Sequence, residues 1–74
     1  MSEQRGRPAF RTTGFLRQGY QVEDVDDFLD EVFDALAGGR PVPDIGGARF
    51  RNRRGGYEVS EVDAFLDELA AELG

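Results

Sequence analysis

The residues that could do chemistry in this 74-residue chain are carboxylates and guanidinium groups, because it contains 15 Asp and Glu, nine basic residues that are all Arg, and no Cys or His. The absence of Cys, His and Lys excludes a thiol nucleophile, an imidazole base, a Schiff-base amine, a zinc-finger ligand set and a P-loop lysine. Catalysis would have to use carboxylates, hydroxyls or Arg. The composition therefore favours binding, and no enzyme activity is predicted.

The first candidate cluster is the run of acids at residues 23–34. An EF-hand counted from Asp24 needs an oxygen ligand and then a glycine at its fifth and sixth positions, but these positions hold Phe28 and Leu29. Two pairs spaced i, i+4 could hold a divalent ion loosely: Asp26/Asp30 and Asp63/Asp67. A solvated helix face explains the same pairs, so we predict no metal site and no cofactor.

The second candidate cluster consists of Arg residues interleaved with Phe: Arg5, Arg7, Arg11 and Arg17 with Phe10 and Phe15, then Arg49, Arg51, Arg53 and Arg54 with Phe50. This composition would suit RNA, anionic lipid or an acidic partner helix, and solvated surface Arg is the plain alternative. Thirteen acids in residues 20–36 and 57–74 would repel a nucleic acid, and no nucleic-acid motif is present. We therefore predict neither a nucleic-acid partner nor a small-molecule substrate.

The elements that must position these side chains come from an internal repeat. A shift of 37 residues places 19–36 on 56–73 with ten identities in eighteen positions, and Phe10-Arg11 matches Phe50-Arg51 at a shift of 40. The first unit thus carries three extra residues before its Gly-Tyr pair. We predict a first loop-helix unit at 1–37, a Gly/Pro linker at 38–47 and a second unit at 48–74.

Each unit predicts one short amphipathic helix, because its apolar residues recur at i, i+3, i+4 and i+7. The predicted fold is all-α, with the two helices paired as a helical hairpin or a dimeric bundle. The helix at 22–36 would span only about 22 Å, too short for a self-sufficient coiled coil. The residues expected at the interface with a partner helix are Val25, Phe28, Leu29, Val32, Val62, Phe65, Leu66 and Leu69.

The size of the chain predicts association. A single core in so short a chain supplies about 3 to 5 kcal/mol, and the usual supplements are disulfides, metals or oligomerisation. Since Cys and His are absent, we expect a second copy or a related chain as partner.

Charge alternates along the chain, at +3 for residues 1–19, −7 for 20–36, +4 for 37–56 and −6 for 57–74. Basic loops therefore alternate with acidic helices, and the net charge of −6 hides what a loop could bind. No run of 18 apolar residues occurs, and residues 1–11 lack the apolar region of a signal peptide. We expect a cytoplasmic chain that does not span the membrane.

The string Gly-Tyr-Gln-Val-Glu-Asp-Val-Asp-Asp-Phe-Leu-Asp at 19–30, and its copy at 56–67, resemble the Gly-Tyr-Asp-x-x-Glu-Val-Asp-x-Phe-Leu signature of DivIVA domains. The leading Phe10 and Phe50 also fit, and the chain is similar to small bacterial proteins built of tandem DivIVA-type repeats. The resemblance implies a peripheral-membrane scaffold at the inner face of the membrane, acting in cell division or polar growth. It also implies a domain that dimerises and presents the loop before Gly-Tyr to the bilayer, without catalysis. The repeat suggests a further hypothesis, that the two units fill both halves of such a dimer within one chain.

The chain departs from the family where members that bind membranes carry Phe-Arg before Gly-Tyr, because these positions hold Arg17-Gln18 and Arg54-Gly55. In the first unit Phe15-Leu16 lie just upstream and could replace the apolar wedge. The residues expected to bind the membrane are Phe15, Leu16, Arg17, Arg53 and Arg54. The alternative is a soluble adaptor that binds a protein partner and never touches lipid.

Overall fold

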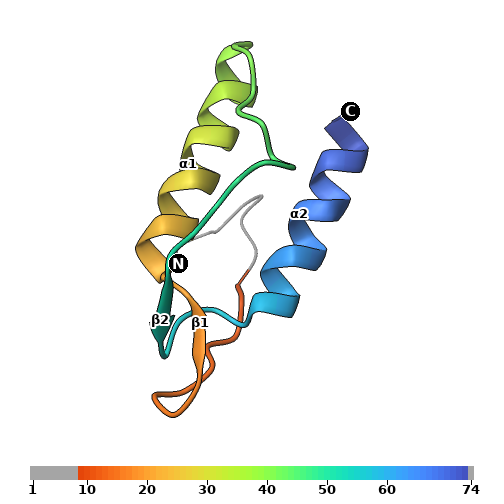
Figure 1. The fold of residues 1–74 in the computed structure, drawn as a ribbon. Coiled ribbons are helices and arrows are strands. Elements are labelled where there is room, and N and C mark those ends of the chain that lie inside the picture. Colours follow the sequence, from red (N-terminus) through yellow and green to blue (C-terminus); the bar gives the residue numbers. More distant parts are fainter. Residues whose placement is uncertain (1–8, 74) are drawn as a thin grey trace.

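The computed structural model describes residues 9–73 and contains two helices and two short strands (Figure 1). Strand β1 (Gln18–Tyr20) leads into helix α1 (Val22–Gly38), and strand β2 (Asn52–Arg54) precedes helix α2 (Val59–Leu73). The predicted first unit begins at Met1 and the second ends at Gly74. Residues 1–8 and Gly74 lie outside the described residues, so those two boundaries are not placed.

Both predicted helices are present, and glycine ends the first of them. Helix α1 stops at Gly38, and Gly39 takes up left-handed backbone with φ 69°, a conformation that costs glycine little. The N–H groups of Gly39 and Arg40 donate to the carbonyls of Leu36 and Ala35, at 3.3 and 2.8 Å. This closure turns the chain back along α1 into the linker.

The loop before each helix contributes a short strand, so the fold is not purely all-α as expected. Strands β1 and β2 pair antiparallel, with Gln18 opposite Arg54 and Tyr20 opposite Asn52. Three-residue strands show no readable alternation of polar and apolar residues, and they form here because two distant segments pair. The fold is therefore two helices, about half of the described chain, joined by a small two-stranded sheet.

The two helices run in the same direction away from the sheet, with the linker returning along them (Figure 1). A helical hairpin would need antiparallel helices, so that part of the fold prediction is wrong. The reason lies in the Gly-Tyr pairs, because the N–H of Tyr20 donates to the carbonyl of Tyr57 at 2.9 Å and the reverse bond measures 2.8 Å. Each helix begins two residues after its tyrosine, so both helices must begin at the sheet.

The contacts between the two units occur in pairs with the roles exchanged. The Tyr20 hydroxyl donates to Asp63 and the Tyr57 hydroxyl donates to Asp26, both at 2.9 Å. The rings repeat the pattern, since Phe50 packs edge-on against Tyr20 and Phe28, whereas Phe10 packs edge-on against Tyr57 and Phe65. The units are therefore related by an approximate two-fold axis within one chain.

The core lies between the helices and draws on both units and the linker. Its buried members are Val25, Leu29, Val32, Ile45, Val62 and Leu66. Ile45 places the linker in the core, at 8% exposure. One core therefore holds the two units together.

Candidate functional site

The loop before β1 carries an exposed apolar pair on an ordered turn. The N–H of Arg17 donates to the carbonyl of Gly14 at 3.3 Å, which leaves Phe15 and Leu16 as the two central residues of the turn. The Thr13 hydroxyl lies 3.0 Å from the Arg17 carbonyl and donates to it, and Gly14 adopts φ 83°. Phe15 is 74% exposed and Leu16 is 81% exposed. The fold thus presents two large apolar side chains to solvent on a closed turn.

The matching loop of the second unit forms a basic turn instead. The N–H of Gly56 donates to the carbonyl of Arg53 at 3.0 Å, and Gly55 in the middle has φ 73°, which favours glycine. The N–H of Gly55 also donates to the Arg17 carbonyl at 3.1 Å, which ties the two loops together. We call residues 12–18 and 52–56 the tip.

The five side chains predicted to bind the membrane all lie at the tip, and their charges differ. Arg17 forms an ion pair with Glu58 at 3.2 Å, so its charge is partly neutralised. Arg53 and Arg54 are exposed and form no ion pair within residues 9–73. The tip therefore combines an apolar turn from the first unit with two guanidinium groups from the second that no carboxylate of the described residues pairs with.

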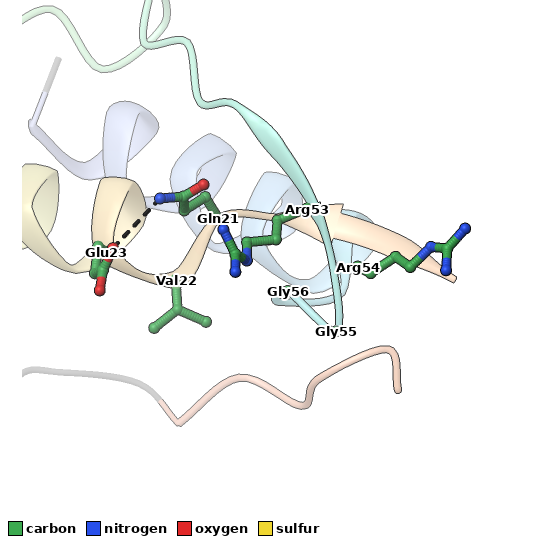
Figure 2. Close-up of a pocket in the computed structure, with 7 residues that line it drawn as sticks. All are labelled: Gln21, Val22, Glu23, Arg53, Arg54, Gly55 and Gly56. Carbon is green, nitrogen blue, oxygen red and sulfur yellow. Dashed lines mark hydrogen bonds between the residues drawn. The ribbon is translucent and has the colours of Figure 1, made fainter. Parts of the chain in front are cut away.

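A shallow pocket of about 230 Å³ lies beside the basic turn, where the chain enters α1 (Figure 2). Figure 2 shows the Arg53 side chain extending toward Gln21 and Val22, whereas the Arg54 side chain extends away from them. The Gln21 amide donates to Glu23 at 3.3 Å on the other wall. Two arginines and a carboxylate thus line this pocket, which suits polar contact at a surface more than capture of a free anion.

The side chains expected at a partner-helix interface lie inside this chain's own core or against it. Five are buried, namely Val25, Leu29, Val32, Val62 and Leu66. Phe28, Phe65 and Leu69 are half-buried and pack against the same cluster. In this structure the helix faces meet each other through the shared core, so a further partner would have to use other surfaces.

The acid pairs that suggested a loose divalent-ion site have other contacts. Asp26 and Asp63 accept the hydroxyls of Tyr57 and Tyr20 across the two units. Burial and then the bond to Asp63 raise the pKa of Tyr20, so its hydroxyl remains a donor at neutral pH. Within residues 9–73 no three Asp, Glu, His or Cys side chains gather as a metal site would need. Identical Tyr and Asp at the same spacing in both units was the signal for these bonds.

Sequence reasoning also missed a second pair of contacts, made by the arginines that follow Phe10 and Phe50. The Arg51 side chain donates to Asp24 through Nε at 3.0 Å and Nη2 at 2.9 Å, and its backbone N–H adds a third bond at 3.0 Å. Arg11 holds Glu61 in the equivalent way, with backbone N–H and Nε contacts of 2.9 and 3.0 Å. The Phe-Arg repeat could have indicated that these two arginines are structural.

The Asp24–Arg51 contact predicts how stability changes with pH. Hydrogen bonds from the Arg51 side chain, and then from its backbone, lower the pKa of Asp24 to about 2. Because an unfolded Asp titrates near pH ~4, this contribution to stability is present above that pH and is lost as pH falls through about 2. We expect the urea midpoint of the parent to fall between pH 4 and pH 2, and to fall less steeply in Asp24→Asn.

The matched control is Asp27→Asn, because Asp27 is exposed on the same helix. This variant should retain the steep acid dependence of the parent. A midpoint that falls as steeply in Asp24→Asn as in the parent would contradict the assignment to Asp24.

Comparisons with protein-family models, with curated proteins and with solved structures find no match to this chain. Within the described residues, neither helix combines the length and the apolar character needed to cross a bilayer. Functional inference therefore depends on the geometry of the chain itself. Its most distinctive feature is the tip, where apolar and cationic side chains that are far apart in the sequence meet at one end of the molecule.

Proposed function

We propose that this chain is a non-enzymatic, DivIVA-like interaction module that docks on anionic membrane surfaces through its tip. The observation that carries the proposal is the exposed Phe15-Leu16 turn beside Arg53 and Arg54, which form no ion pair with any of residues 9–73. Cell division or polar growth in bacteria is the setting implied by the resemblance of its two Gly-Tyr strings. The paired packing of the two units supports that resemblance, because one chain supplies both halves of a two-fold assembly.

The apolar turn supplies most of the binding free energy. Burying a Phe or Leu side chain is worth about 1.5 to 3 kcal/mol each. Because the turn is already closed by backbone and Thr13 hydrogen bonds, little backbone order remains to be imposed on docking. An exposed apolar pair held in this way is suited to enter the interfacial region of a bilayer.

The basic turn adds attraction and selectivity for anionic lipid. Each Arg near an anionic surface contributes about 1 kcal/mol, so Arg53 and Arg54 together add about 2 kcal/mol. The net charge of −6 opposes binding, but its acids lie mainly on helices that extend away from the tip (Figure 1). At physiological salt, charge is screened over about 8 Å, so the tip governs the encounter.

Co-sedimentation with phosphatidylglycerol/phosphatidylcholine vesicles tests the proposal. The parent should bind at low salt, bind less as salt rises, and fail to bind pure phosphatidylcholine. Phe15→Ser/Leu16→Ser should weaken binding about a hundredfold or more, whereas Arg53→Ala/Arg54→Ala should weaken it about thirtyfold at most. The apolar pair is expected to matter more because its burial carries the larger free energy.

The matched control is Leu36→Ser/Leu73→Ser. It removes exposed leucines near the C-terminal ends of the two helices, away from the tip. This variant should bind vesicles as the parent does. If the parent stays in the supernatant with anionic vesicles at low salt, membrane docking is wrong and a soluble adaptor for a protein partner takes its place.

A further inference from the structure

A shallow hollow whose lining is partly apolar lies away from the tip, beside the last turns of α2. It measures about 260 Å³ and is formed by the linker and the last turns of α2, with Val42, Pro43, Ile45, Ala70 and Leu73 as its apolar lining. We call it the distal hollow. Leu73 at its edge is 42% exposed, and Leu36, at the end of the other helix, is 41% exposed. The chain thus leaves apolar surface uncovered at both of its ends.

The surroundings of the distal hollow are acidic. Asp44 lines it, and Glu72 lies in the last turn of α2, which contains no basic residue. The C-terminal end of a helix also carries partial negative charge. The Arg40 guanidinium lies against Gly38 at the end of the other helix. Arg49 lines a neighbouring pocket that shares Ile45 and Ala70 with the hollow, and Asp63 and Asp67 line that pocket too. The hollow therefore favours an apolar ligand that carries positive charge.

The tip of a second copy has that chemistry. Phe15 and Leu16 are the most exposed large apolar side chains of the described residues, and Arg53 and Arg54 stand beside them with no ion pair there. We propose that the tip of one copy docks in the distal hollow of the next. Phe15 and Leu16 then contact the apolar side chains of the hollow, and the guanidinium groups meet Asp44 and Glu72.

A chain cannot fill its own hollow. The tip lies where the parallel helices begin (Figure 1), whereas the hollow is lined by Ala70 and Leu73 in the last turns of α2. The 17 residues of α1 span about 25 Å along that path. Because the tip and the distal hollow are different surfaces, the contact between two copies is head-to-tail. Repeated head-to-tail contacts build a row of copies, or a closed ring if the rotation between neighbours allows it. The short length of the chain predicts self-association. Because the apolar helix faces are already buried in one core within the chain, self-association would use the two ends of the molecule instead.

This inference goes beyond the proposed membrane docking and uses the same tip. A tip in the bilayer is withdrawn from the distal hollow, so anionic vesicles should compete with self-association. Membrane docking and self-association both use the tip, but only self-association also uses the distal hollow. A variant of the hollow should lose self-association and retain vesicle binding.

Sedimentation velocity over a concentration series at low salt, without lipid, tests the proposal. The parent should show a mass that rises with concentration past the dimer and falls as salt is added. Leu73→Asp and Phe15→Ser/Leu16→Ser should each weaken self-association about tenfold or more. Leu73→Asp should still bind vesicles, and circular dichroism should show the parent's helix content, because Leu73 is exposed in the last turn.

Charge exchange provides a second test that does not depend on losing a contact. Arg53→Glu/Arg54→Glu reverses the tip, and Asp44→Arg/Glu72→Arg reverses the hollow. Each variant alone should remain monomeric at concentrations where the parent associates. A mixture of the two should associate into alternating rows that contain equal amounts of each variant. Parent protein that stays monomeric throughout, a Leu73→Asp variant that associates as the parent does, or a mixture that forms no complex would overturn the proposal.

Discussion

Gly56→Ala and Gly19→Ala are each expected to remove most of the stability of the chain. A Cβ at Gly56 would overlap the backbone carbonyl of Tyr20, and one at Gly19 would overlap that of Tyr57. These carbonyls accept the paired hydrogen bonds that join the two units, so relief of the overlap must lengthen or break those bonds. Overpacking of this kind costs about 1 to 3 kcal/mol, and loss of the bonds adds to it.

We expect melting temperatures at least about 12 °C below the parent, since 1 kcal/mol shifts a domain of this size by about 4 to 8 °C. Thermal unfolding followed by circular dichroism measures the effect. Gly46→Ala is the matched control, because its Cβ would meet only Asp44 Oδ1 at 3.8 Å, an ordinary contact. A Gly56→Ala protein that melts with the parent would show that the two loops do not approach so closely.

The helices could be predicted from the sequence because apolar periodicity is a local signal. The predicted span 22–36 differs from the observed α1 by only two residues at its end, and Gly38-Gly39 marks that end as expected. Burial of Val25, Leu29 and Val32 follows from the same periodicity. Local spacing thus carries this part of the fold.

The sheet and the direction of the helices could not be predicted, because they depend on pairing between distant segments. Asn52, Arg53 and Arg54 form a strand whose three residues are all exposed, so no apolar pattern marks it. The repeated Gly-Tyr pair was visible, but its meaning requires the other copy to lie against it. Once Tyr20 and Tyr57 exchange hydrogen bonds, parallel helices and the paired Tyr–Asp contacts follow.

The tip shows the same division between local and distant information. Phe15 and Leu16 could be singled out because they are a large apolar pair just upstream of the first Gly-Tyr string, where the resemblance to DivIVA domains predicts an apolar wedge. Their presentation on a turn closed by Thr13 could not be anticipated, since it depends on a hydroxyl and on the left-handed backbone at Gly14. The first loop, with its three extra residues, forms an apolar turn, and the second loop forms a basic turn. The two units of the chain therefore differ most at the tip.

Leu29→Ala and Leu66→Ala should each cost about 2 to 5 kcal/mol. Leu29 is 1% exposed and Leu66 is 8% exposed, at equivalent positions of the two units. A chain of this size has about 3 to 5 kcal/mol in total, so either variant should be close to unfolding at room temperature. Urea unfolding at low temperature measures the loss. Leu36→Ala and Leu73→Ala, which truncate half-exposed leucines of the same helices, should cost less than about 1 kcal/mol.

The two core variants also test whether the units share one core. Leu29 belongs to the first unit and Leu66 to the second, yet both pack in one cluster with Ile45 of the linker. Either substitution should therefore lower the midpoint of a single transition that involves the whole chain. If Leu66→Ala split the transition and left half of the helical signal melting as in the parent, the units would be independent. A shared transition instead requires both halves to fold together, which is how one chain can hold the apolar turn of one unit beside the basic turn of the other.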